Sequence, residues 1–208
     1  MKTHPKPLSA LQNSQNSHPA KSSAVRTDAR QKNRRFRGQI QIYTGNGKGK
    51  TTAALGLAFR AAGHGCRTFF GQFMKAQPSG ERAAARKLGG LITFAMFGRP
   101  GLIHVKGRPD PEDVRRARRG LARCRTAVRS GGYDLIVLDE INVALHFGLL
   151  DLEEILAFLD ERPPSVEIIL TGRRAPAALI RRAGLVTEMK EIKHYYAAGV
   201  PARRGIED

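Results

Sequence analysis

The feature that most constrains this chain is a run of Gly and Lys residues between an apolar segment and a helical one. Residues 39–44 read as a short strand, and residues 50–63 have the composition of a helix that ends in Gly. A strand, a tight glycine-rich turn and a helix start in direct succession leave several backbone N–H groups without intrahelical partners. Such a helix start is a ready site for phosphate groups. The turn, which we call the phosphate loop, consists of Gly45, Asn46, Gly47, Lys48, Gly49, Lys50, Thr51 and Thr52.

The phosphate loop matches the signature G-x-x-x-x-G-K-[ST] at every position but the first, where Thr44 stands in place of Gly. In this motif, glycines let the backbone wrap around phosphates, the Lys reaches them, and the hydroxyl binds Mg²⁺. We therefore expect the backbone N–H groups of residues 45–50 to face a triphosphate, Lys50 to neutralise it and Thr51 to bind the metal. The alternative is a surface turn that is merely rich in Gly and Lys.

A second motif supports the phosphate loop. Residues 135–138 are an uninterrupted apolar run, and Asp139 and Glu140 follow it directly. A buried strand that ends in acids places a carboxylate at the edge of the sheet where Mg²⁺ binds in nucleotide-binding α/β folds. Asp139 and Glu140 are thus candidate metal ligands. Either residue alone could instead be a structural cap before a loop at 141–148.

Apolar runs alternate with helical patterns along the rest of the chain, which predicts a mainly parallel sheet covered on both faces. The fold class is therefore a doubly wound α/β domain with the RecA-like architecture of P-loop nucleotide-binding proteins. Strands are expected at 39–44, 67–73, 91–96, 134–139, 166–170 and 186–189, and helices at 50–63, 82–88, 111–130, 152–161 and 176–183.

Residues 1–37 differ from the remainder in composition. They hold nine Lys and Arg against one Asp and few large apolar residues, so we expect a disordered basic tail, followed by one domain at 38–208. The net charge of +18 attracts polyanions in general. Because we find no nucleic-acid-binding motif, an Arg-rich surface without such a role is favoured.

Other features of the sequence bear on the location of the protein. No apolar stretch is long enough to span a membrane, and the N-terminus lacks the apolar segment of a secretory signal. Cys66 and Cys124 have no metal-binding or redox spacing, and are expected to be buried free thiols in a reducing cytoplasm.

Several short segments resemble the cob(I)alamin (corrinoid) adenosyltransferases. They are 43–54 with Thr in the first-Gly slot, the Gln72-Phe73-Met74-Lys75 run, residues 139–145, the Thr-Gly-Arg triplet ending at Arg173, and 198–207. The resemblance extends from about Gly38 to the C-terminus. It implies transfer of the 5′-deoxyadenosyl group of ATP to the cobalt(I) of a corrinoid, either cobalamin or cob(I)yrinic acid a,c-diamide, with release of triphosphate.

The resemblance also implies how the residues act. Cobalt(I) is itself the nucleophile, so no side-chain base is required, and the protein must position and stabilise an anionic leaving group. Lys50, Lys48 and Arg60 would serve that task together with Mg²⁺ or Mn²⁺. In relatives the nucleotide lies reversed in the phosphate loop, which exposes the ribose 5′ carbon. Relatives commonly form homodimers, and a flavin-type reductase is a possible partner.

The chain departs from the family pattern in one element. Well-known members carry a Phe-x-Trp element after the third strand that is thought to displace the lower ligand of the corrinoid, whereas this chain has no Trp. Phe97, Leu102 or Ile103 would have to replace it, although ordinary loop packing accounts for each equally well. His64 and His194 match family positions and are expected to be structural. Arg173 could contact phosphate or cap a helix.

Two other functions remain open at this point. A kinase or ATPase would use the same phosphate loop but would release ADP. An ATP-switched nucleic-acid-binding protein would depend on the basic tail and lose salt-sensitive binding when residues 1–37 are removed.

Overall fold

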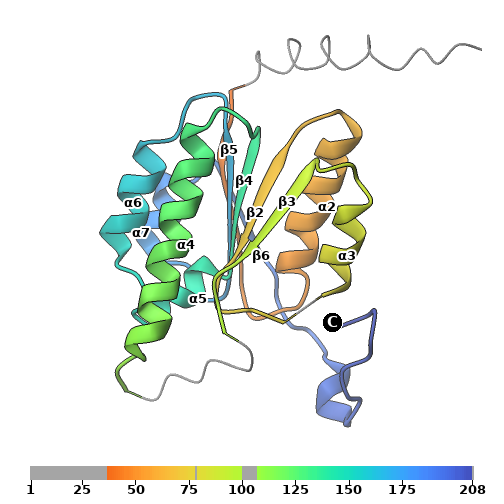
Figure 1. The fold of residues 1–208 in the computed structure, drawn as a ribbon. Helices are drawn as coiled ribbons and strands as arrows, with labels where there is room; N and C mark the ends of the chain where they lie inside the picture. Colours follow the sequence, from red (N-terminus) through yellow and green to blue (C-terminus); the bar gives the residue numbers. More distant parts are fainter. Residues whose placement is uncertain (1–36, 78, 100–106, 208) are drawn as a thin grey trace, which may run out of the picture.

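The computed structural model describes residues 37–77, 79–99 and 107–207 as an α/β sandwich (Figure 1). Six parallel strands form one sheet in the order β3-β2-β4-β5-β1-β6. The strands are β1 Ile40–Thr44, β2 Thr68–Gln72, β3 Ile92–Met96, β4 Leu135–Asp139, β5 Glu167–Thr171 and β6 Leu185–Glu188. The helices are α2 Lys50–Gly63, α3 Gly80–Arg86, α4 Pro111–Arg129, α5 Ile141–His146, α6 Leu152–Asp160 and α7 Ala177–Arg182, followed by the 3₁₀ helix η2 Tyr195–Ala198.

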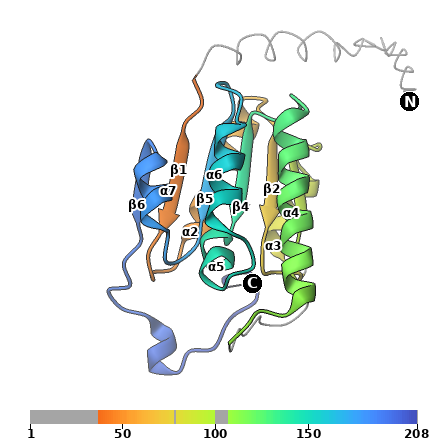
Figure 2. The same cartoon turned by 90° about the vertical axis from the view of Figure 1, so that its left-hand side faces the viewer.

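Helices cover both faces of the sheet, which confirms the doubly wound α/β fold. α2 and α3 lie on one face, and α4, α5, α6 and α7 lie on the other (Figures 1 and 2). Three of the four inner strands, β2, β4 and β5, are buried along their whole length, as expected for parallel strands covered on both sides. The edge strand β6 is exposed throughout.

The pattern of small and apolar residues explains how the helices pack. α2 buries Ala54, Ala58 and Ala62, which recur every four residues and therefore lie on one side of the helix. Their small side chains let α2 approach the sheet closely. α4 buries a second stripe on the opposite face, which includes Leu121 and Cys124.

Both cysteines of the chain fall in the described residues, where they are buried thiols without a disulfide.

The expected strands and helices are present, with ends that differ from the prediction by at most two residues. One prediction is wrong: residues 141–148 were expected to form a loop, but Ile141–His146 form α5. This helix has only six residues and no side-chain cap, so it lacks the usual sequence signals for a helix start. Ile141 and Ala144 are fully buried, so tertiary packing supports the helix.

The strand order brings the two sequence motifs to one edge of the sheet. β1 leads into the phosphate loop and β4 ends in Asp139, and β5 lies between these two strands. Because all strands are parallel, their carboxyl ends meet at the same edge, where ligands bind in open α/β sheets. After β6, the chain crosses below this edge and returns toward the start of α2 (Figure 1).

Candidate functional site

The phosphate loop is held in shape by glycines and by the chain that follows β6. Gly45 and Gly49 have φ of 92° and 113°, which is the left-handed region that favours glycine. A Cβ on Gly45 would lie 2.4 Å from the carbonyl oxygen of Met189. The N–H of Gly47 donates to the same oxygen at 2.7 Å, so the expectation that every N–H of residues 45–50 faces a triphosphate is wrong for Gly47. The loop therefore rests on Met189, and its two left-handed glycines are required by geometry.

Lys50 lies inside the curve of this loop. Its side chain is buried, and Nζ donates to the carbonyl oxygens of Gly45 at 2.9 Å and Gly47 at 2.6 Å. Burial lowers the pKa of Lys50, and the nearby carboxylate of Glu140 opposes that effect. The ammonium group is thus placed where a phosphate chain wrapped by the loop would lie.

Thr51 joins the phosphate loop to the end of β4. Its hydroxyl donates to Oδ1 of Asp139 at 2.9 Å. The same oxygen accepts a hydrogen bond from the Thr171 hydroxyl at 2.7 Å, and Oδ2 accepts one from Gln72 Nε2 at 3.2 Å. Asp139 is therefore held by donors from the ends of β2 and β5 and from the start of α2.

Glu140 stands beside this cluster in an unusual backbone conformation. Its φ is 60°, and its N–H donates to the Thr171 hydroxyl at 2.9 Å. Burial raises the pKa of Asp139, and the hydrogen bonds from Thr171, Thr51 and Gln72 oppose this shift. Burial, and next the charge of Asp139, raise the pKa of Glu140. A cation beside the two carboxyl groups would favour their ionised forms.

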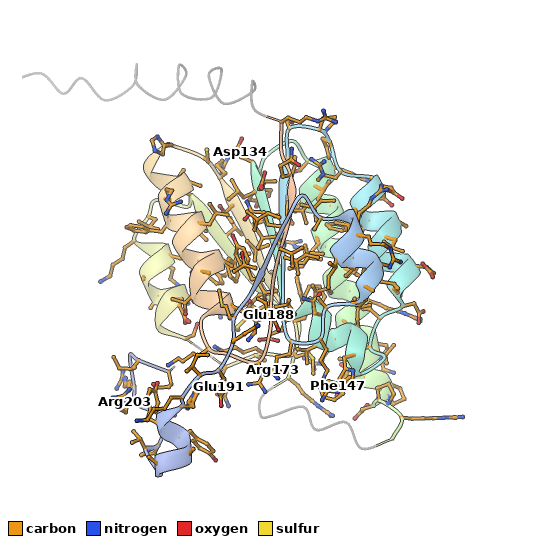
Figure 3. All side chains as sticks on the ribbon, turned by 180° about the vertical axis from the view of Figure 1, so that it is seen from behind. Asp134, Phe147, Arg173, Glu188, Glu191 and Arg203 are labelled. Carbon is orange, nitrogen blue, oxygen red and sulfur yellow. The ribbon has the colours of Figure 1, made fainter. Side chains whose placement is uncertain are left out.

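A cavity of about 490 Å³ opens over the phosphate loop. Cationic and anionic side chains both line it. The cations are Lys48, Lys50, Lys75 and Arg173, and the anions are Glu81, Glu140, Glu191 and Glu207. Figure 3 shows Arg173 and Glu191 at this end of the sheet, with Asp134 at the opposite end. The mixture of charges suits a multiply charged anion together with a metal ion.

The structure brings most of the predicted site residues together. The cavity is lined by Asn46, Gly47, Lys48, Gly49, Lys50, Thr51, Thr52 and Glu140. Gly45 and Asp139 lie directly behind this wall, through their contacts with Lys50 and Thr51. Arg173 and His194 also line the cavity, and His194 accepts a hydrogen bond from the N–H of Tyr196 at 3.0 Å.

Arg60 is not brought to the cavity. It lies ten residues after Lys50 on α2, which places it roughly 15 Å further along the helix axis. Its side chain is exposed and is not among those that line the cavity. His64 lies further still, at the C-cap of the same helix.

The sequence analysis assigned no site role to several parts of the cavity wall, namely Leu55, Lys75, Gly80, Glu81, Glu191 and residues 205–207. Lys75 and Glu81 could have been found, because they follow β2 and the carboxyl ends of parallel strands line such sites. Glu191 and 205–207 follow the last strand. Residues 205–207 belong to a segment that resembles the family, but their approach to the cavity depends on how the chain returns after β6, which no local pattern predicts.

The donor groups at the cavity fit a magnesium-type ion. Among the described residues there is no group of three or more His, Cys, Asp or Glu side chains that could hold a metal by itself. Mg²⁺ commonly uses only one or two protein oxygens, completed by phosphates and water. The hydroxyl of Thr51 and the carboxylates of Asp139 and Glu140 are oxygen donors of that kind.

The structure gives Phe97 a packing role. Its ring lies 5.2 Å from that of Phe73, centroid to centroid, and a Cβ on Gly120 would lie 2.5 Å from it. Phe97 therefore packs between β2 and α4. This is the ordinary packing role that the sequence analysis gave as the alternative to a corrinoid wedge. Leu102 and Ile103, the other two candidates for a corrinoid wedge, lie outside the described residues.

Within the part of the chain that the structure describes, no helix has the length and apolarity needed to cross a bilayer.

Comparison with known proteins identifies the family of this chain. The family model described as ATP:corrinoid adenosyltransferase BtuR/CobO/CobP matches residues 36–207. A corrinoid adenosyltransferase of Sinorhizobium sp. is 37% identical over 174 residues, which cover 82% of this chain and 80% of that protein. Those of Pseudomonas aeruginosa and Escherichia coli K12 are 34% and 35% identical over 172 residues, covering 82% of this chain and 84% and 86% of theirs. The chain therefore belongs to the ATP:corrinoid adenosyltransferase family.

Proposed function

We propose that this chain transfers the 5′-deoxyadenosyl group of ATP to the cobalt of a reduced corrinoid and releases triphosphate from the phosphate loop. The observation that carries the proposal is the position of Lys50, whose ammonium is buried inside the loop next to the Thr51–Asp139 hydrogen bond. A family match that covers residues 36–207 supports the same reaction.

The reaction needs little from the protein beyond position and charge. Cobalt(I) supplies both electrons of the new bond to the ribose C5′ carbon. The C5′–O bond breaks, and its electron pair leaves with the triphosphate. No proton has to be removed from the nucleophile, so a side-chain base is not required. What lowers the barrier is stabilisation of the departing anion in a preorganised site.

We assign the residues as follows. The N–H groups of residues 45–50 other than Gly47, whose N–H donates to Met189, hold the phosphates together with the ammonium of Lys50. Lys48 and Arg173 add positive charge at the rim of the cavity. Arg60 is left out because of its place on α2. Thr51 and Glu140 would bind Mg²⁺ or Mn²⁺, with Asp139 holding the Thr51 hydroxyl from behind. The metal would supply charge neutralisation of the leaving group.

We extend the proposal to the setting of the enzyme. The substrate is cobalamin or a precursor such as cob(I)yrinic acid a,c-diamide, and a flavin-type reductase would deliver the electron for cobalt(I). The domain at 38–208 would work as a homodimer in the cytoplasm. These points follow from the resemblance to the family.

The direct test is anaerobic incubation of the protein with Mg²⁺, ATP and a chemically reduced corrinoid. We expect the visible spectrum to change to that of a cobalt–carbon bond, with one triphosphate released per bond formed. Formation of ADP in place of triphosphate would instead identify a kinase or ATPase.

A substitution in the phosphate loop tests whether the loop takes part in the reaction. Lys50→Ala removes a charge-assisted contact to the leaving group, so we expect kcat/KM to fall at least roughly a hundredfold. Lys87→Ala is the matched control, since Lys87 is exposed at the end of α3 and does not line the cavity. A near-normal rate for Lys50→Ala would contradict the placement of the loop.

A further inference from the structure

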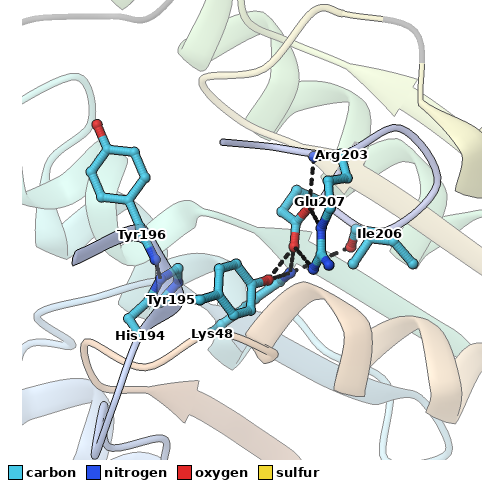
Figure 4. Close-up of polar contacts among 7 residues, drawn as sticks. All are labelled: Lys48, His194, Tyr195, Tyr196, Arg203, Ile206 and Glu207. Atoms are coloured by element: carbon cyan, nitrogen blue, oxygen red, sulfur yellow. Dashed lines mark hydrogen bonds and ion pairs between the residues drawn. The ribbon is translucent and has the colours of Figure 1, made fainter. Parts of the chain in front are cut away.

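The segment that follows β6 makes a dense set of contacts with the phosphate loop (Figure 4). Nζ of Lys48 donates to Oε1 of Glu207 at 2.9 Å, to the Tyr195 hydroxyl at 3.0 Å and to the carbonyl oxygen of Ile206 at 3.4 Å. The Lys48 ammonium also lies 5.7 Å from the centroid of the Tyr195 ring. A residue of the predicted phosphate site is therefore already bound by the end of the same chain.

Glu207 is itself fixed by its neighbours. The backbone N–H of Arg203 donates to Oε2 at 2.7 Å, and the Arg203 guanidinium donates to Oε1 at 3.1 Å. The Tyr195 hydroxyl donates to Oε1 as well. Hydrogen bonds from Arg203, Tyr195 and Lys48 lower the pKa of the Glu207 carboxyl. The group is therefore a carboxylate at neutral pH.

This carboxylate lies in the wall of the cavity that the triphosphate would enter. Gly205, Ile206 and Glu207 line the cavity together with Lys48 and Lys50. A bound triphosphate would bring several negative charges close to Glu207, and both would be attracted to the ammonium of Lys48. Like charges near one another are unfavourable, and a single ammonium cannot satisfy both anions equally.

We propose that Glu207 competes with the triphosphate for Lys48, so that residues 195–207 leave the phosphate loop when the nucleotide binds and return when triphosphate departs. This inference rests on the proposed function, because it needs triphosphate to bind at Lys48. Its consequence is that Glu207 favours product release: a carboxylate from the same chain replaces the leaving phosphates, and the freed ammonium is not left unpaired.

Inorganic triphosphate with Mg²⁺ is a probe that needs neither corrinoid nor reductant. We would measure its binding by isothermal titration calorimetry to the full-length protein and to Glu207→Gln, which keeps the size of the side chain but removes its charge. We expect roughly threefold to tenfold tighter binding to the variant at low salt, with a smaller difference at high salt.

A matched control separates local competition from net charge. Glu161→Gln also removes one negative charge, but Glu161 is paired with Arg125 and Arg129 on the other face of the sheet, outside the cavity. We expect its affinity for triphosphate to equal that of the wild type. In a Lys48→Gln background, Glu207→Gln should raise the affinity less than it does in the wild type, because the ammonium for which the two anions compete is absent and only their direct repulsion remains.

The outcomes distinguish this inference from the proposed function. Equal or weaker binding of triphosphate to Glu207→Gln, with normal binding to the wild type, overturns the competition and leaves the proposed function standing. A wild type that binds no triphosphate overturns both. If Glu207→Gln and Glu161→Gln raised the affinity for triphosphate equally, the change in net charge would explain the effect, and the competition would be overturned.

Hydrogen exchange gives a second readout that does not depend on the variant. The N–H of Arg203 is bonded to Glu207, and that of Val200 is bonded to Tyr195. If the segment leaves the loop, amides in residues 195–207 exchange faster when triphosphate is added to the wild type. Slower exchange would show that the segment closes over the ligand, which contradicts the competition.

Discussion

Thr44 occupies the position at which the phosphate-loop signature has its first Gly. It is the last residue of β1 and has no positive φ, so a β-branched residue is suited to its conformation. Its side chain is buried, and its hydroxyl accepts a hydrogen bond from the N–H of Ala175 at 3.3 Å. In this chain the left-handed turn begins one residue later, at Gly45.

We therefore predict that restoring the signature harms the protein. Thr44→Gly removes a hydrogen-bond acceptor and adds conformational freedom to the unfolded chain, which should lower the free energy of unfolding by about 1–2 kcal/mol. Urea denaturation measures this difference. Thr44→Ser keeps the hydroxyl and should lose less. A Thr44→Gly variant as stable as the wild type would show that the hydroxyl and strand conformation contribute nothing.

The carboxyl group of Asp139 predicts a pH dependence of stability. Burial raises its pKa in the folded state above the unfolded value of ~3.9. Folding thus favours the protonated form of Asp139. The stabilisation that comes from this protonation is fully present below the unfolded pKa and is lost as the pH rises through the folded pKa.

Asp139→Asn removes this titration. In the presence of a chelator, the free energy of unfolding of the wild type minus that of the variant should fall as the pH rises above about 4. Urea denaturation at a series of pH values measures it. A difference that stays constant or rises with pH would mean that the hydrogen bonds from Thr171, Thr51 and Gln72 outweigh burial, and that the pKa is not raised.

At the scale of the elements, two helical glycines of equal propensity have opposite surroundings. Gly56 in α2 is exposed, and a Cβ there would meet no atom within 4 Å. Gly120 in α4 is buried, and a Cβ there would lie 2.5 Å from the ring of Phe97. Packing between α4 and the sheet, not helix propensity, accounts for Gly120.

These surroundings predict changes of opposite sign. Gly56→Ala should raise the free energy of unfolding by about 1 kcal/mol, because Ala is the better helix former. Gly120→Ala should lower it by about 1–3 kcal/mol, because the added methyl forces Phe97 out of its place. Thermal and urea unfolding of the two variants provide the comparison. Stabilisation by both substitutions would argue against close packing of α4 on Phe97.

At the scale of the whole molecule, the composition of residues 1–37 predicts a tail outside the domain. The family match begins only at residue 36. Deletion of residues 2–36 should therefore leave the free energy of unfolding within about 0.5 kcal/mol of the wild type. It should also leave triphosphate binding unchanged. A loss of corrinoid turnover on deletion would give the tail a role at the active site, and a loss of nucleic-acid binding would support the switched-binding alternative.

The sequence by itself determined the local parts of this protein. The phosphate loop could be predicted with its glycines and Lys50, because the strand, turn and helix that form it are continuous in the chain. The apolar run before Asp139 likewise predicted a buried strand that ends in an acid. The parallel α/β class followed from the alternation of strands and helices, since such connections place helices on both faces.

Only the tertiary structure decided how these parts meet. It put β5 between β1 and β4, which brings the Thr171 hydroxyl onto Asp139. It formed α5 where no capping signal exists, and left Arg60 outside the cavity. It also brought Glu207 to Lys48 across a separation of 159 residues. Contacts of this kind depend on strand order and on the path of the chain after β6, which are set by the packing of the whole domain and leave no local pattern.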